Sequence, residues 1–155
     1  MIAALLFAVS VQETIDNPEY KGWASFKPGS SVTFKYSPQE GGQKVTLKSV
    51  GENEIAIEVV TTYNGRTGEP AERKVPAKLP AAQAPKDVKQ GEEEIEAGGK
   101  KLKCRTMEYE KKLPGGKTVA LKIWVHDDVP GKGVRIQTTS ETGKFTMLAT
   151  EWEKK

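Results

Sequence analysis

The chain has 155 residues, of which 36% are hydrophobic and 29% are charged, a length that suits one domain. Its 24 Lys and Arg residues and 21 Asp and Glu residues give a net charge of only +3, with both signs interspersed, which disfavours a nucleic-acid-binding protein. A single cysteine excludes an intrachain disulfide and any site built on paired cysteines, and no apolar run approaches the ~20 residues of a membrane-spanning helix.

The N-terminal segment has the composition of a secretory signal. Residues 1–12 read MIAALLFAVSVQ, an apolar run without a charged side chain, and acidic residues follow from Glu13 onward. A run of ~7–15 apolar residues that ends in small side chains forms the central part of a signal peptide. We therefore expect residues 1–10 to be removed on export, the mature chain to begin near Val11, and the protein to be secreted or periplasmic in a bacterium. The alternative is that this segment is a first strand or helix of the domain.

A short helix and a series of strands follow. Asn17, Pro18 and Glu19 are typical of a helix N-terminus, with a capping side chain, a proline in the first turn and an acid beside it. Pro28 and Gly29 end this element after about two turns. Apolar and polar residues then alternate with the period of a β-strand, which predicts the three strands of a meander at 32–36, 45–47 and 55–59.

Residues 64–90 interrupt this alternation. They contain the prolines 70, 76, 80 and 85, spaced too closely for a helix or a central strand, so we predict a crossing over the surface. Alternation resumes near Glu94 and continues to Trp152. The sequence thus predicts a mainly β fold, a curved, half-barrel-like antiparallel meander of roughly eight to ten strands with one short N-terminal helix. Residues 13–155 form its single domain.

In one predicted strand, the apolar residues change from one face to the other along its length. Leu102, Cys104 and Thr106 lie in one phase, and then Met107 and Tyr109 lie in the other, whereas the next strand keeps one phase throughout (Val119, Leu121, Ile123 and Val125). If both strands face one core, a β-bulge is needed near Thr106 and Met107. This arrangement buries Cys104 as a small core residue on the face of Val119, and it places Lys103 and Arg105 on the opposite face, beside Trp124 and His126. A cation–π contact between Arg105 and Trp124 would suit it.

Two segments resemble binding motifs but are better explained as turns. Gly116, Lys117 and Thr118 match the end of a phosphate-binding loop, but Lys111 stands where that loop needs its first glycine, and no helix follows, so we predict a hairpin turn. The segment 126–128 (His-Asp-Asp) could bind a divalent cation. It leads straight into a Val-Pro-Gly turn, however, and lacks the further His, Cys or alternating oxygen ligands of zinc and calcium sites.

Three further groups are also better explained as structure. Cys104 and His126 could form a nucleophile–base pair, but the alternation assigns them to opposite faces. The four glutamates in residues 92–96 could pair as in glycoside hydrolases; with four basic residues in 100–105, they indicate a charged sheet surface instead. Four aromatic residues could line a ligand groove: Tyr20, Trp23, Trp124 and Trp152. We expect instead that Tyr20 and Trp23 cap one end of the sheet as part of the packed core. We therefore predict no catalytic, cofactor-binding or metal-binding residue.

Two segments resemble a group of uncharacterised exported bacterial β-domain proteins. Residues 99–105 (GKKLKCR) and 124–134 (WVHDDVPGKGV) carry the shared pattern, which is an acidic strand, GKKLKC and W-x4-VPGG; residues 17–36 agree more loosely. Lys132 departs from the pattern because a second glycine commonly stands there. The resemblance implies an exported β domain and no known activity. More remotely, the strand count and expected export are similar to the lipoprotein-localisation carriers, whose half-barrel holds acyl chains under helices that this sequence does not show.

These observations favour an exported, non-enzymatic β domain that binds a hydrophobic ligand, such as a lipid, or an envelope component on its curved sheet. The alternative is a structural or interaction domain of the cell envelope without a small ligand. An enzyme of another type is a further alternative; it would need polar groups that converge in a pocket, which only a structure can show.

Overall fold

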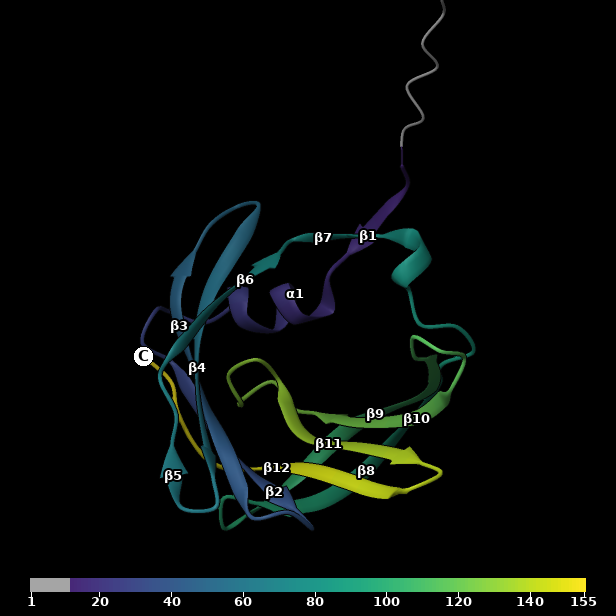
Figure 1. Ribbon diagram of the computed structural model, residues 1–155. Coiled ribbons are helices and arrows are strands. Elements are labelled where there is room, and N and C mark those ends of the chain that lie inside the picture. Colours follow the sequence, from purple (N-terminus) through teal and green to yellow (C-terminus); the bar gives the residue numbers. More distant parts are fainter. Residues whose placement is uncertain (1–11) are drawn as a thin grey trace, which may run out of the picture.

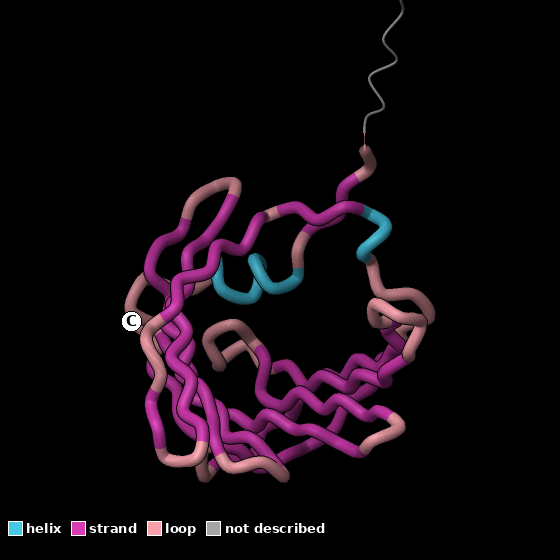
Figure 2. The backbone as a smooth tube through the Cα atoms, viewed as in Figure 1, coloured by secondary structure: helices cyan, strands magenta, loops and turns pink. Residues whose placement is uncertain are grey.

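A ten-stranded antiparallel sheet curves around a central space without closing into a barrel (Figures 1 and 2). The computed structural model describes residues 12–155, so the expected signal segment 1–10 and the mature start near Val11 lie outside the described residues. In order along the sheet, its strands are β5 (Arg66–Thr67), β4 (Glu54–Tyr63), β3 (Gly41–Val50), β2 (Ser31–Ser37), β12 (Gly143–Glu153), β11 (Gly133–Ser140), β10 (Thr118–Val125), β9 (Lys100–Lys112) and β8 (Lys89–Ala97), and β6 (Ala71–Pro76) pairs with β4. The predicted mainly β, open and curved architecture is confirmed.

The sheet consists of two meanders joined at one seam. Strands β2 to β6 follow one another along the chain, and so do β8 to β12, whereas β2 pairs with β12. In this seam Phe34 lies opposite Ala149, and Tyr36 lies opposite Met147. The seam is the only strand pairing in residues 12–155 that joins the two meanders.

The helix α1 (Pro18–Ala24) lies on the concave side of the sheet (Figure 1). It begins as predicted: the side chain of Asn17 accepts a hydrogen bond from the backbone N–H of Glu19 at 3.0 Å, and Pro18 occupies the first turn. Trp23 is buried toward the sheet, and the hydroxyl of Tyr20 donates a hydrogen bond to the carbonyl of Gly51 at 2.6 Å. α1 is therefore tied to the β3–β4 turn through Tyr20 and packed into the core through Trp23.

The proline-rich crossing is more ordered than predicted. It contains the edge strand β6, and then β7 (Lys78–Pro80), which pairs with β1 (Thr14–Asp16), and a 3-10 turn, η1 (Ala81–Gln83). Pro76 and Pro80 stand at strand ends, where a missing N–H is tolerated. We call residues 77–88 the strap. It passes over the open side of the sheet and connects its two meanders (Figure 2).

The β-bulge predicted near Thr106 and Met107 of β9 is wrong. The pairing of β9 with β10 runs without a shift from Lys112–Thr118 to Arg105–Val125. Met107 therefore lies opposite Ile123 on the concave face. By alternation, Cys104 and its neighbours of the same parity lie on the convex face. The predicted sharing of one face by Cys104 and Val119 is wrong, because β9 is buried on both sides rather than on one.

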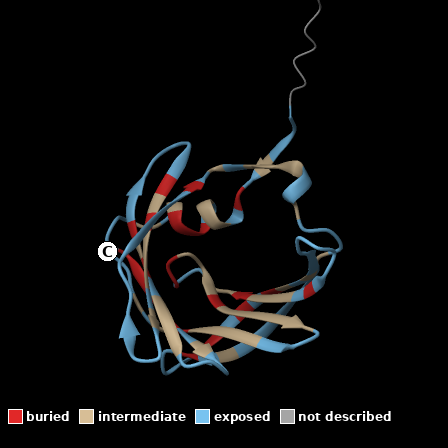
Figure 3. Cartoon of the chain, in the orientation of Figure 1, coloured by how far each residue is buried: buried red, intermediate tan, exposed pale blue. Residues whose placement is uncertain are grey.

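On the convex face of β9, Thr106 lies beside Trp124 of β10, whose ring is flanked by the long side chains of Lys122 and Arg135. Leu102 and Cys104 lie opposite Ile95 and Glu93 of β8, and the β8–β9 turn packs against Trp152 of β12, where a Cβ on Gly98 would come within 2.7 Å of the ring. Cys104 is 1% exposed as a result. Figure 3 shows buried residues on strands at both ends of the sheet.

Within residues 12–155, no helix has the length and apolar character needed to cross a bilayer.

Candidate functional site

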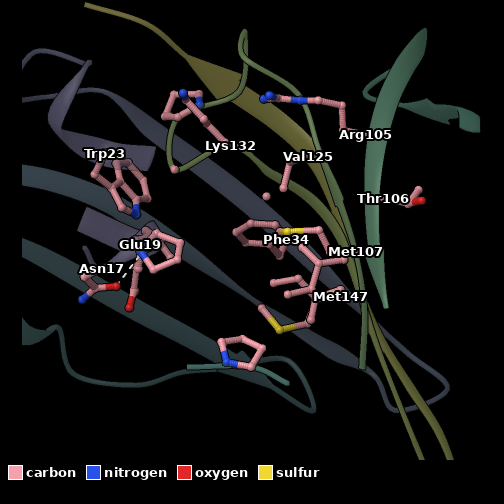
Figure 4. A pocket seen from close by; sticks show the side chains of 18 of the residues that line it. Asn17, Glu19, Trp23, Phe34, Arg105, Thr106, Met107, Val125, Lys132 and Met147 are labelled. Atoms are coloured by element: carbon pink, nitrogen blue, oxygen red, sulfur yellow. Dashed lines mark hydrogen bonds between the residues drawn. The ribbon is translucent and has the colours of Figure 1, made fainter. Parts of the chain in front are cut away.

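The concave face of the sheet encloses a cavity of about 970 Å³ (Figure 4). Its walls come from elements far apart in the sequence: both meanders of the sheet, α1, the strap and the β10–β11 loop, residues 126–132. The sheet contributes a predominantly apolar floor, lined by Phe34, Val45, Ile57, Val59, Met107, Tyr109, Ile123, Val125, Ile136 and Met147. Period-two alternation produces this floor, since every second residue of each strand points inward.

Flexible side chains shape the centre of the floor. Figure 4 shows Phe34, Met107 and Met147 around one space, and they come from β2, β9 and β12, respectively. Methionine is unbranched and polarisable, so it can adapt to ligands of different shapes. Tyr109 of β9 also lines the floor, and burial raises the pKa of its hydroxyl above the ordinary value. The floor therefore suits an apolar ligand rather than a charged one.

The β10–β11 loop closes one end of the cavity against α1. The backbone N–H of His126 donates to the carbonyl of Lys132 at 2.9 Å, and the N–H of Lys132 donates to the carbonyl of Val129 at 2.7 Å. Gly131, at φ +77°, lies so close to Trp23 that an added Cβ would be 2.7 Å from the indole ring. Val129 of the same loop is fully buried. The loop is thus a packed wall of the site.

Charged side chains lie around the rim of the cavity rather than on its floor. On one side the guanidinium of Arg73 forms a two-point ion pair with the carboxylate of Glu19, with one contact at 3.1 Å. On the other, the guanidinium of Arg105 and the ammonium of Lys132 approach the same oxygen of Asp127, at 2.9 and 3.5 Å. An apolar interior with a charged rim is the arrangement that an amphipathic ligand needs.

Several sequence-based interpretations of candidate residues are confirmed. Residues 113–117 form a hairpin turn closed by the hydrogen bond from the N–H of Leu113 to the carbonyl of Lys117, at 2.7 Å. Glu92, Glu94 and Glu96 of β8 lie opposite basic residues of β9, which are Arg105, Lys103 and Lys101. Opposite charges across a strand pair stabilise its register, so these runs form the charged sheet surface that the sequence predicted.

The segment 126–128 forms part of the loop and its surface contacts. The Nδ1 atom of His126 accepts a hydrogen bond from the backbone N–H of Asp128 at 3.2 Å, and the Asp128 carboxylate pairs with Lys154 at 3.2 Å. No cluster of three or more His, Cys, Asp or Glu side chains suited to a metal occurs within the described part of the chain. No hydrogen bond joins Cys104 to His126 among these residues, and the cysteine is a free thiol.

The predicted contact between Arg105 and Trp124 is wrong. Arg105 lies opposite Val125 and lines the cavity, whereas Trp124 is on the convex face and is flanked by Lys122 and Arg135, whose cationic groups are 4.8 and 4.7 Å from the ring centre. The indole N–H donates to Glu93 at 2.7 Å. The error follows from the assumed bulge, which inverted the faces of β9.

Of the four aromatic residues considered as a groove lining, one lines the cavity and three do not. Trp23 lines the cavity, as the groove interpretation expected, and it is also 4% exposed, as the core interpretation expected. Trp124 and Trp152 do not line it. Sequence reasoning missed the floor residues as a site because their alternation has the same signal as an ordinary core. The available signal was the number of strands, which exceeds what a minimal sandwich needs and so indicates an apolar sheet face left to be filled.

Comparisons with known proteins give a similar fold and no information about function. No family model and no curated protein matches the chain. The solved structure of a hypothetical protein from Chlamydia trachomatis is similar, with a TM-score of 0.55 and 7% sequence identity, over 91% of this chain and 93% of that chain. At this identity the likeness shows the fold alone. The chain therefore shares its overall fold with a solved structure across nearly its whole described length.

Proposed function

We propose that the protein is an exported, non-enzymatic β domain that binds a hydrophobic ligand in the concave cavity. The observation that carries the proposal is the cavity of about 970 Å³ with its apolar floor. It lies at the upper end of the range of about 300–1,000 Å³ found for small-molecule sites. The charged groups at its rim include Arg73, paired with Glu19, and Arg105, paired with Asp127.

The first experiment asks whether the cavity holds an apolar molecule. Protein purified from a bacterial host is extracted and analysed for lipid by mass spectrometry, and the delipidated protein is titrated with N-phenyl-1-naphthylamine, an uncharged probe that fluoresces in apolar sites. We expect co-purifying lipid and saturable probe binding. Repeated absence of both would contradict the proposal and leave the alternative, an interaction domain of the envelope without a small ligand.

A matched pair of variants assigns binding to the concave face. Met107→Trp fills the cavity, whereas Glu108→Trp adds the same ring to the next residue of β9, which is exposed and on the other face. We expect Met107→Trp to weaken probe binding at least about tenfold and Glu108→Trp to leave it unchanged. Equal effects of the two variants, at similar melting temperatures, would mean that the probe binds elsewhere.

Export is tested separately by N-terminal sequencing of protein recovered from the periplasm or medium. The apolar composition of residues 1–10 supports cleavage near Val11. An intact Met1 on folded protein in the cytosol would contradict export without bearing on ligand binding.

A further inference from the structure

We infer that Arg105 and Lys132 form a head-group subsite, and that the ligand is a single-chain amphiphile with an anionic head group. The inference rests on the proposed function, since it names the class of ligand for the same cavity. Three observations carry it: two cations that converge on one point of the rim, a row of apolar side chains that starts at that point, and an unusual backbone conformation that presents one of the cations.

The two cations already hold a carboxylate oxygen. The Nη2 atom of Arg105 and the Nζ atom of Lys132 lie 2.9 and 3.5 Å from the same atom, Oδ1 of Asp127. A guanidinium carries five N–H groups and an ammonium carries three, so most of their donors remain for another anion. Asp127 thus marks where an oxygen of a ligand head group would bind, and its contact resembles the one that the ligand would make.

Asp127 holds these cations weakly. Its side chain is 72% exposed, and that of Arg105 is 61% exposed, and ion pairs in such surroundings contribute little because water screens them. A second carboxylate, that of Glu92, also lines the cavity and lies opposite Arg105 in the β8–β9 pairing, but within residues 12–155 it forms no ion pair with Arg105. An incoming anion therefore competes mainly with the exposed carboxylate of Asp127 for the two cations.

The rim leads directly into the apolar floor. Along β9 the inward residues are Arg105, Met107 and Tyr109, and along β10 the corresponding residues are Val125, Ile123 and Leu121. Successive inward residues on a strand are about 6.6 Å apart. One charged position at the water-facing end, followed by apolar positions, has the polarity of an amphiphile with its head at the rim and its chain along the floor.

Lys132 is presented at a conformational disadvantage. Its φ is +61°, a region that glycine or asparagine adopts readily and that other residues rarely adopt. The residues on either side of it, Gly131 and Gly133, are glycines, the residue type that adopts such a conformation readily, whereas position 132 is a lysine. A lysine in this conformation, with its ammonium at the cavity rim, is consistent with a requirement for the charge itself.

The test compares dodecanoate, dodecyl phosphate and dodecanol as competitors of N-phenyl-1-naphthylamine, which has no charged group. For the unmodified protein we expect at least one of the two anions to displace the probe at about tenfold lower concentration than dodecanol, equivalent to ~1.4 kcal/mol. A preference for dodecanoate alone assigns a carboxylate head group, and a preference for dodecyl phosphate alone assigns a phosphate.

Variants show where the preference originates. Arg105→Gln and Lys132→Gln should each reduce the preference for the anion to less than about threefold, and Asp127→Asn should increase it, because it removes the competing carboxylate. The control is Lys154→Gln, which removes a cation that pairs with Asp128 of the same loop but does not line the cavity. It should leave the preference unchanged.

The outcomes separate the two proposals. If the probe does not bind, or no competitor displaces it, the proposed function itself is wrong. If dodecanol and both anions displace the probe equally, or if Asp127→Asn and Lys132→Gln leave an existing preference unchanged, the cavity binds apolar ligands but the head-group subsite is wrong.

Discussion

Cys104 shows how one residue can be assigned correctly in role and wrongly in place. It is 1% exposed, as the sequence predicted, but it lies on the convex side of β9, opposite Glu93, rather than beside Val119. Burial raises the pKa of its thiol, which lowers the fraction of reactive thiolate. Cys104 therefore serves as a small, buried apolar side chain on the convex face of β9.

Substitution of Cys104 should destabilise the fold in a definite order. We expect Cys104→Ala to lower the free energy of unfolding by about 1–2 kcal/mol, and Cys104→Ser to lower it further, because a buried hydroxyl without a partner adds about 1–3 kcal/mol. Denaturant titration measures both. Native-state labelling with a thiol reagent should be slow and should accelerate with denaturant; rapid native labelling, or a disulfide-linked dimer on a non-reducing gel, would contradict burial.

Gly22 sets the distance between α1 and the β10–β11 loop. Within a helix, replacing glycine by alanine normally stabilises by about 0.5–1 kcal/mol. Here a Cβ would lie 2.6 Å from the carbonyl oxygen of Gly131, which is backbone and cannot rotate away. We expect the clash to prevail, so that Gly22→Ala destabilises by about 1–3 kcal/mol in denaturant titration.

The control for this prediction is Gly133→Ala, where the nearest atom to an added Cβ is the side-chain Cδ1 of Ile136 at 3.8 Å, an ordinary contact. It should change stability by less than Gly22→Ala does. A Gly22→Ala protein more stable than the unmodified one would show that α1 moves freely relative to the loop.

At the scale of elements, β1, α1 and the strap are held together around Asp16. Its carboxylate pairs with Lys21 of α1 at 2.6 Å and with Lys78 of β7. Beside it, the side-chain amide of Asn17 donates to the carbonyl of Pro76 at 2.7 Å, and the backbone N–H of Asn17 donates to the carbonyl of Ala77 at 2.9 Å. These contacts attach the strap to the N-terminal segment.

The Asp16 contacts should make stability depend on acid pH. Hydrogen bonds from Lys21 and Lys78 lower the pKa of Asp16 from 3.8 to about 2. A carboxylate with a lowered folded-state pKa stabilises the fold above its ordinary pKa, and this contribution is lost as the pH falls from about 4 through 2. The melting temperature of Asp16→Asn should therefore decline less over this interval than that of the unmodified protein.

The effect should be small, since the group is exposed and its ion pairs are screened by water. Asp87→Asn, which removes an exposed carboxylate elsewhere in the strap, provides the control and should follow the unmodified protein. Parallel pH profiles for the unmodified protein and Asp16→Asn would contradict a role for this cluster.

Sequence alternation identified the strands but not the faces. The capped start of α1, the meander from β2 to β4 and the later strands were predictable, because their signals are local. The edge strand β6 was missed within the proline-rich segment, since its pairing with β4 depends on tertiary contact. The faces of β9 were inverted because the alternation was interpreted with one buried side, whereas this strand has the cavity on one side and a packed layer on the other.

At the scale of the whole molecule, two connections within the described residues hold the meanders together: the covalent strap and the hydrogen-bonded β2–β12 seam. We expect the seam alone to hold the two meanders together when the strap is cut. A protein with a site-specific protease sequence inserted between Pro85 and Lys86, both in the strap, should remain associated after cleavage and elute as one species in size-exclusion chromatography. Denaturant should separate the two fragments. Dissociation under native conditions would show that the strap, and not the seam, maintains the cavity.

The seam also determines the order in which the chain can fold. Thr150 of β12 hydrogen-bonds to Thr33 of β2 across 117 positions of sequence, whereas the other strands of the sheet pair with near neighbours along the chain. Hairpins close quickly and distant pairings close late. During synthesis β2 is made early and its partner β12 is made after all the other strands, so one edge of β2 stays unpaired until then. The cavity does not exist before that step, and a chain interrupted there presents an apolar, open-edged sheet that is prone to aggregate.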